Sequence, residues 1–178
     1  EQARGINFKP DGTIMYITNR KPLGGDANQE GQVTQYSLST PFDISTATKT
    51  SQTDLLGGGS TPVLKYPHAI EFKPDGTKMF VVSGDVYSDV YQYKLTTAWD
   101  SSSAEFETIH AVTRDNDTRH LRTLAFKPDG TRMYTGGKSN PSTESKIKQF
   151  TLTNPWDLTS GVSSAVLSDD LGSSEPNL

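Results

Sequence analysis

One segment of this sequence occurs three times, and this repeat limits the possible fold more than any other feature. Each copy contains Phe-Lys-Pro-Asp-Gly-Thr, followed after one residue by Met and an aromatic residue. The three copies occupy Arg4–Thr13, His68–Thr77 and Arg122–Thr131. Two further blocks follow each copy: a Gln-aromatic-x-Leu block at Gln35, Gln92 and Gln149, and an aromatic-Asp pair at Phe42, Trp99 and Trp156. The chain is therefore predicted to contain three similar structural units.

Apolar residues alternate with other residues in each unit, which predicts β-strands rather than helices. The Lys-Pro-Asp-Gly sequence predicts a tight turn after the first strand, because Pro fixes φ and Gly accepts a left-handed conformation. The Met-aromatic pair marks a second strand and the Gln-aromatic-x-Leu block a third. A Ser/Thr-rich fourth strand is predicted near residues 47–53, 104–112 and 161–168. Four antiparallel strands repeated radially are typical of β-propeller blades.

The predicted fold is an all-β β-propeller with three four-stranded antiparallel blades. The blades are expected at about residues 3–55, 66–114 and 119–169, with a linker at 170–178. Propellers usually have about 4–8 blades, so three would leave two apolar blade faces open. We therefore expect an open arc that is part of a six- or seven-bladed ring, or half of a ring made by two copies. The low hydrophobic content of 32% fits thin sheets that pack against one another.

These motifs resemble a family of bacterial and phage-borne propeller repeats with the pattern F-x-P-D-G-T-x-M-Y, V-x-Q-Y-x-L and P-W-D. The repeats are loosely similar to the YVTN and lactonase-like propellers, and the resemblance covers about residues 3–168. It implies the propeller fold. It implies no single activity, because such propellers include binding modules, virion or surface proteins and a minority of enzymes.

Three basic residues occupy the same position in the three repeats. They are Arg4, His68 and Arg122. The alignment places one at the channel mouth of each blade, and we predict that they bind a ligand. Basic donors arranged in this way would orient a carboxylate, a phosphate or an acidic sugar.

The face that carries these residues is also predicted to carry the segments whose length varies between repeats. Those segments are residues 18–32, 83–89 and 135–146. Variable loops on one face indicate a binding surface. The alternative is that the three basic residues pair with acids such as Asp115 or Asp117, or face channel water, because repeats also repeat packing residues.

Other repeated residues are predicted to have structural roles. Turn formation is predicted for Asp11, Asp75 and Asp129, and turn capping for Asp43, Asp100 and Asp157. Blade packing is favoured over a sugar-stacking platform for Phe42, Trp99 and Trp156. The stretch 114–120 is only weakly similar to a calcium loop. A metal site at His110 and His120 is less favoured than a chance pairing of two histidines. We expect neither a metal nor a cofactor.

Composition limits the function classes. The 17 basic and 21 acidic residues argue against nucleic-acid binding, and no apolar run is long enough to predict membrane insertion. There is no cysteine, so thiolate chemistry is excluded. The leading hypothesis is a non-enzymatic module, extracellular or on a cell or virion surface, that binds a protein or glycan. The alternatives are a lactonase-like hydrolase and a structural subunit of a fibre or capsid. The remaining blades, or a second copy, are the other expected partners.

Overall fold

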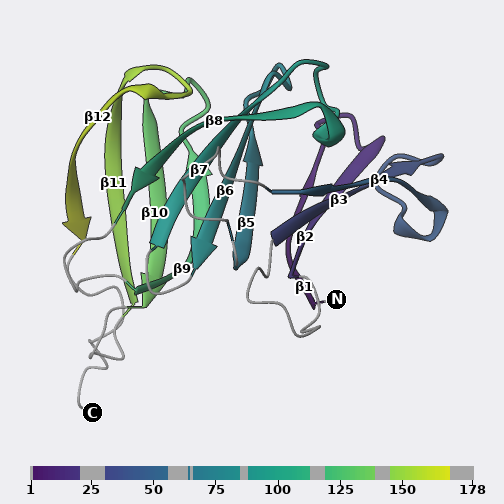
Figure 1. Ribbon diagram of the computed structural model, residues 1–178, viewed down its shortest axis with the longest axis horizontal. Helices are drawn as coiled ribbons and strands as arrows, with labels where there is room; N and C mark the ends of the chain where they lie inside the picture. Colours follow the sequence, from purple (N-terminus) through teal and green to yellow (C-terminus); the bar gives the residue numbers. More distant parts are fainter. Residues whose placement is uncertain are drawn as a thin grey trace, which may run out of the picture.

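The protein folds into three four-stranded antiparallel sheets, one for each sequence repeat (Figure 1). The computed structural model describes residues 2–20, 31–55, 64, 66–84, 88–112, 119–138 and 145–168. Blade 1 contains β1 (Gln2–Phe8), β2 (Ile14–Arg20), β3 (Gly31–Leu38) and β4 (Ala47–Asp54). Blade 2 contains β5 (Pro67–Phe72), β6 (Lys78–Gly84), β7 (Ser88–Leu95) and β8 (Ala104–Ala111). Blade 3 contains β9 (Arg119–Phe126), β10 (Arg132–Lys138), β11 (Ser145–Asn154) and β12 (Asp157–Ser168).

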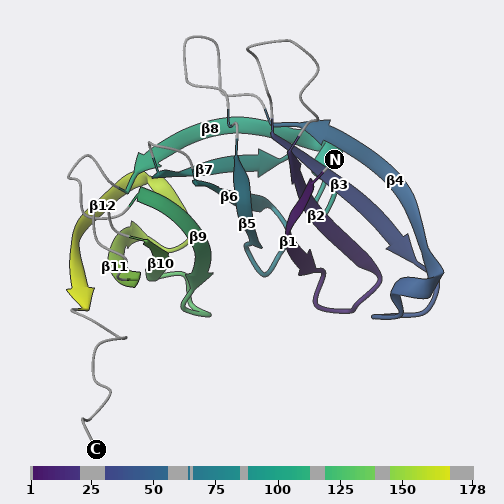
Figure 2. The ribbon, with the colours of Figure 1, turned by 90° about the horizontal axis from the view of Figure 1, so that it is seen from below.

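The blades form an open arc (Figure 2). In each blade the strands pair in chain order, so the first strand is innermost and the fourth is outermost. The inner strand β5 packs between β1 and β9, while β4, β8 and β12 lie on the outside of the arc. This arrangement confirms the predicted all-β propeller fold with three four-stranded blades.

The entry into the fourth strand differs between the blades. In blades 1 and 2, short 3₁₀ helices η1 (Ile44–Thr46) and η2 (Ser101–Ser103) precede β4 and β8. In blade 3 the chain is already extended at Asp157, so β12 begins earlier than the predicted start near residue 161. Gly161 interrupts this longer strand with a φ of 108°.

The apolar cores lie between blades rather than within one central core. Between blades 1 and 2, the ring of Tyr16 lies 4.3 Å from that of Phe72, which lies 5.5 Å from Trp99. Between blades 2 and 3, Phe80 and Trp156 both pack on Phe126, at 4.6 and 4.7 Å between ring centroids. The few apolar residues are thus buried in two thin layers between the blades.

A glutamine on the third strand closes each of these junctions. The side-chain oxygen of Gln35 accepts a hydrogen bond from the backbone N–H of Ser101 at 2.8 Å. At the second junction, Gln92 accepts from the backbone N–H of Leu158 at 2.7 Å. Both junctions therefore use the same repeated residue to join one blade to the turn of the next.

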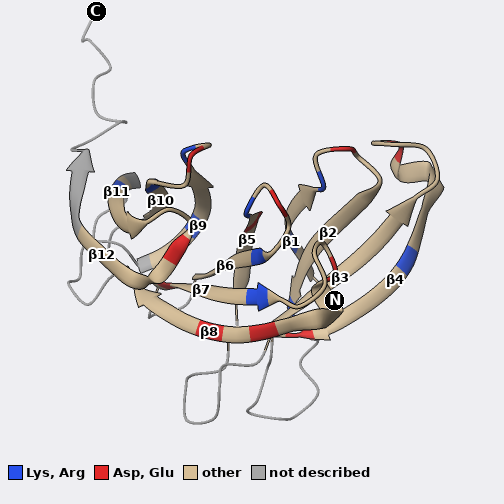
Figure 3. Cartoon of the chain, turned by 90° about the horizontal axis from the view of Figure 1, so that it is seen from above, with Lys and Arg blue, Asp and Glu red and all other residues tan. Residues whose placement is uncertain are grey.

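Charged residues of both signs are distributed around the arc (Figure 3). Acidic residues lie on β8, basic residues lie on β4 and β7, and the turns after the inner strands carry both. Within the described ranges, no helix has the length and apolarity needed to cross a bilayer.

Candidate functional site

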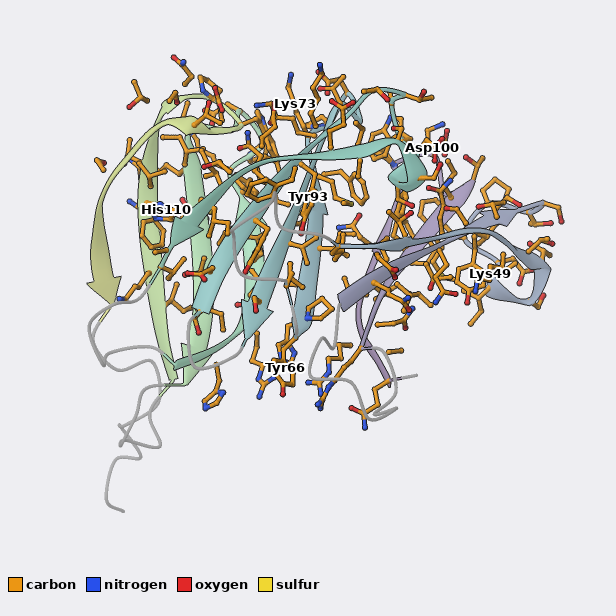
Figure 4. The ribbon with its side chains drawn as sticks, in the orientation of Figure 1. Lys49, Tyr66, Lys73, Tyr93, Asp100 and His110 are labelled. Atoms are coloured by element: carbon orange, nitrogen blue, oxygen red, sulfur yellow. The ribbon has the colours of Figure 1, made fainter. Side chains whose placement is uncertain are left out.

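The two ends of the inner strands differ in character. The strand register pairs Gln2 with Arg20 and Pro67 with Ser83, so each inner strand starts where the second strand of its blade ends. We call this the loop end, because the connections from second to third strands leave there. The Lys-Pro-Asp-Gly turns lie at the other end, the turn end. Figure 4 shows Tyr66 and Lys73 at these opposite ends of β5. Most of the predicted variable segments, residues 18–32, 83–89 and 135–146, lie outside the described residues.

Three basic side chains, one from each blade, meet at the loop end. Arg4 Nη1 lies 3.3 Å from His68 Nε2, and Arg122 Nη1 lies 3.0 Å from His68 Nδ1 and also contacts Nε2. Arg4 Nη2 donates to Gln2 Oε1 at 3.2 Å. We call Arg4, His68 and Arg122 the basic cluster. The structure thus brings together all three residues that the alignment singled out.

Burial and mutual repulsion both act on the titratable groups of the cluster. Burial, and after it the charges of Arg122, Arg4 and His120, lower the pKa of His68 to about 4. The ring is therefore neutral near pH 7, and its one unprotonated nitrogen can accept a hydrogen bond from a guanidinium N–H. Burial and the charge of Arg4 lower the pKa of Arg122 as well.

The two arginines have no acidic partner among the described residues. The ion pairs found there all involve lysines. The Nε atom of Arg4 is buried and makes no hydrogen bond. Arg122 is an exposed residue, whereas His68, which its Nη1 contacts, is buried. The acids that the sequence offered as alternative partners, Asp115 and Asp117, lie outside the described residues.

Close backbone approach holds His68 in place. A Cβ atom on Gly5 would lie 2.2 Å from the carbonyl oxygen of His68, and one on Gly84 would lie 2.2 Å from its ring. Thr18 Oγ1 accepts from the backbone N–H of Gly5 at 2.8 Å and donates to the carbonyl of His68 at 3.4 Å. His68 is thus packed between blade 1 and the end of β6, and it is 8% exposed.

Sequence reasoning missed the residues that support the cluster. These include Gly5, Gly84 and His120, whose Nδ1 lies 3.3 Å from the carbonyl oxygen of Gly84 and whose φ is 66°. The usable signal is departure from the repeat. Gly5 aligns with Ala69 and Thr123 in the other repeats, so only one repeat needs a glycine there.

The repeated aspartates have the predicted structural roles. In the turns, the carboxylates accept from the backbone N–H groups of Thr13, Thr77 and Thr131, at 3.0, 2.9 and 3.0 Å. Where the chain enters the fourth strands, Asp43, Asp100 and Asp157 accept in the same way from Ser45, Ser102 and Thr159. These carboxylates cap turns, as expected.

The repeated aromatic residues pack on the turns of their own blades. Phe42, Trp99 and Trp156 have φ values of 61°, 65° and 59°, and their rings cover Gly12, Gly76 and Gly130. Trp99 and Trp156 also belong to the layers between blades. Blade packing, the interpretation favoured from the sequence, is confirmed for these two.

The two weak metal hypotheses gain no support. His110 packs edge-on against Phe150, with ring centroids 5.1 Å apart, whereas His120 contacts Gly84. Over the described ranges, no group of three or more His, Cys, Asp or Glu residues is arranged to hold a metal. Most of the calcium-loop-like stretch, residues 114–118, lies outside those ranges.

Comparison with known proteins supports the fold alone. No protein-family model matches the sequence, and no curated protein does. A candidate 6-phosphogluconolactonase from Bacteroides fragilis matches 92% of this chain and 37% of its own, at a TM-score of 0.58 and 14% identity. The periplasmic gluconolactonase of Pseudomonas aeruginosa matches 83% of this chain and 39% of its own, at a TM-score of 0.56 and 17% identity. Hydrazine synthase of Kuenenia stuttgartiensis matches 94% of this chain and 43% of its own, at a TM-score of 0.58 and 14% identity.

The chain therefore spans about two fifths of the length of these solved structures. Two of these three neighbours carry lactonase names and the third does not, so the likeness shows the fold that they share. Their identities to this chain are too low to transfer an activity.

Proposed function

We propose that this protein is a non-enzymatic β-propeller recognition module that binds an anionic group of a glycan or protein at the basic cluster. The observation that supports this is the meeting of Arg4, His68 and Arg122 with no acidic partner among the described residues. We further propose that it acts outside the cell or on a cell or virion surface.

The chemistry of the cluster suits a carboxylate, with phosphate as the other candidate anion. Each guanidinium presents planar donors that match two oxygens, and such charge-assisted hydrogen bonds are short and strong. An anion would also relieve the repulsion between Arg4 and Arg122, which contributes to the lowered pKa of Arg122, and it would offset the two charges that lower the pKa of His68. Binding would therefore raise the pKa of His68 and become tighter as the pH falls.

The experiment compares acidic and neutral glycans on an array, followed by titration calorimetry with glucuronate and glucose. We expect glucuronate to bind and glucose not to bind. The Arg4→Gln and Arg122→Gln variants should each weaken binding roughly tenfold, because each removes a charged hydrogen-bond donor. Lys49→Gln is the matched control, since it removes one positive charge from β4, the outermost strand of blade 1, whereas Arg4 lies on the innermost.

Three results bear on the proposal. Binding of glucuronate that is unchanged in both arginine variants would refute the site. Equal binding of glucose would refute recognition of charge. A loss of binding in Lys49→Gln as large as in the arginine variants would mean that net charge, not the cluster, attracts the ligand.

Lactone hydrolysis is the second candidate. A neutral His68 between two guanidinium groups resembles a general base beside donors for a developing oxyanion, and one structural neighbour is a gluconolactonase. A base with a pKa of about 4 is weak at neutral pH, however, so we rank recognition first. Hydrolysis of glucono-δ-lactone that is lost in His68→Gln would reverse this ranking.

A further inference from the structure

The exposed apolar side chains of this protein lie at repeat positions that are buried in other blades. In the described part of the chain, the large exposed ones are Ile6 at 57%, Phe42 at 58%, Ile44 at 65% and Ile147 at 39%. The aligned residues elsewhere are buried: Ile70 and Leu124 for Ile6, Trp156 for Phe42, Leu158 for Ile44, and Val33 and Val90 for Ile147. The exposure therefore follows position in the arc, not residue type.

Each junction joins two different faces, which we call front and back. The front face of a blade carries the first-strand apolar pair and the aromatic residue before the fourth strand. It receives the back face of the preceding blade, which carries an aromatic residue on the second strand and Val and Gln on the third. Blade 2 shows its front face to blade 1 and its back face to blade 3.

The ends of the arc expose one face of each kind. Blade 1 ends in a front face, formed by Ile6, Phe8, Phe42 and Ile44. Blade 3 ends in a back face, formed by Tyr134, Ile147 and Gln149. Figure 2 shows blades 1 and 3 at opposite ends of the arc. The molecule thus carries both halves of the junction that it already forms twice.

The polar groups of these two faces match as well. In the first junction, Tyr16 donates to the carbonyl oxygen of Trp99 at 2.6 Å, and Gln35 accepts from Ser101 N–H at 2.8 Å. Tyr134 and Gln149 occupy the positions of Tyr16 and Gln35 in blade 3. Phe42 and Ile44 occupy the positions of Trp99 and Ser101 in blade 1, so their backbone groups supply the corresponding acceptor and donor.

We propose that the back face of blade 3 docks on the front face of blade 1 in a second copy of this chain. Two such junctions would close a six-bladed ring with two-fold symmetry, within the usual range of blade numbers. The occupant is a second copy because one chain presents both complementary faces, and each continues a junction observed in the structure. The ring would place two basic clusters around one channel.

Sedimentation equilibrium on the 178-residue chain tests this proposal. We expect the wild-type protein to have twice the 19.4 kDa mass of the monomer. Ile44→Lys on the front face and Ile147→Lys on the back face should each weaken association roughly hundredfold, since each ring would bury two unpaired charges. Both residues are exposed, so the folded monomer should keep its circular dichroism spectrum. Thr48→Lys, on the exposed part of β4, is the matched control and should associate like the wild type.

Mixing the two variants identifies which faces pair. A mixed dimer of Ile44→Lys and Ile147→Lys keeps one intact junction, so the mixture should associate more strongly than either variant alone. A wild-type protein that stays monomeric would overturn the proposal and assign both faces to further blades of a longer chain. Association that survives Ile147→Lys would also overturn it, because the front face would then pair with itself.

Discussion

The turn end and the loop end of the inner strands are built on opposite plans. At the turn end, all three blades make the same contacts within themselves: a Lys–Asp ion pair at 2.5–2.7 Å and an aromatic ring over a glycine. At the loop end, the aligned residues are Arg, His and Arg, and their side chains contact one another across blades. The turn end thus repeats the same contacts within each blade, whereas the contacts at the loop end join different blades.

This difference separates structural from functional repetition. A blade needs its turn whatever its neighbours are, so each repeat keeps the same residues there. A binding site has no such constraint, because residues from several blades contribute different parts of one surface. Substitutions should therefore cost stability at the turn end and ligand binding, rather than stability, at the loop end.

The largest effect on stability is expected for Gly76→Ala at the turn end. Gly76 has a φ of 74°, and a Cβ atom there would lie 2.3–2.5 Å from three atoms of the Trp99 ring. The left-handed backbone and the displaced ring together should lower the free energy of unfolding by about 3 kcal/mol. The midpoint of urea denaturation measures this change.

Gly161→Ala is the matched control for that prediction. Its φ is also positive, at 108°, but its Cβ atom would approach only Thr153 Oγ1, at 3.3 Å. The loss should be about 1–2 kcal/mol, which is the backbone cost alone. Equal losses at the two positions would show that the aromatic ring over the turn does not contribute.

The fold was largely predictable from sequence because the same turn and strand patterns occur in all three repeats. Pro-Asp-Gly fixes each turn, and the alternation of Ile70 and Phe72 or their equivalents fixes which side faces a neighbour. The early start of β12 was not predictable, because similar residues follow the aromatic-Asp pair in all three blades: Ile-Ser-Thr, Ser-Ser-Ser and Leu-Thr-Ser. Local sequence does not show whether those residues extend or turn.

The candidate site was predictable only in part. Alignment placed Arg4, His68 and Arg122 at one level, but the contact between them depends on how neighbouring blades are packed. The neutral state of His68 follows from its burial against Gly5 and Gly84, and burial of one side chain by another blade leaves no local pattern.

The second prediction concerns pH and compares His68 with the carboxylates of the turns. The unfolded His68 takes up a proton near pH 6.5, whereas the folded one does so only near pH 4. The unfolded state therefore binds more protons between these values, and stability should fall by about 2 kcal/mol from about pH 7 to about pH 5. Urea denaturation at several pH values measures the slope.

His68→Gln isolates this effect. The variant should lose most of the slope. The part that remains includes His110, whose pKa burial also lowers, and Glu71, whose pKa burial raises and which acts in the opposite direction. The hydrogen bonds that Asp11 accepts from Lys9 and Thr13 hold its pKa at about 2, so its titration lies below this range. An unchanged slope in His68→Gln would show that His68 is protonated normally, and the description of a neutral ring between two arginines would then be wrong.

The third prediction is a smaller loss at the turn end. In Asp75→Ala the backbone N–H and the hydroxyl of Thr77 lose their acceptor, at 2.9 and 2.6 Å. Because the turn is exposed and water replaces the carboxylate, the cost should be about 1 kcal/mol in urea denaturation. A loss as large as that of Gly76→Ala would mean that the turn depends on the carboxylate more than on its glycine.

The smallest predicted change has the opposite sign and sits at the loop end. Arg4→Gln removes one of two guanidinium groups that face the same histidine. Burial lowers the pKa of Arg122, and repulsion from the charge of Arg4 is the second cause. Relief of this repulsion should raise stability by a few tenths of a kcal/mol at low salt, and about 1 M salt should screen the gain away.

Lys9→Gln is the control at the turn end, where the lysine lies 2.7 Å from Asp11 and its loss should destabilise slightly. The informative quantity is the difference in sign between the two variants at low salt. If Arg4→Gln destabilises the protein as Lys9→Gln does, the cluster holds the blades together and the two ends do not differ in purpose. A gain in stability joined to a loss of glucuronate binding is what a site kept for its ligand should give, because residues selected for binding are held at some cost to the fold.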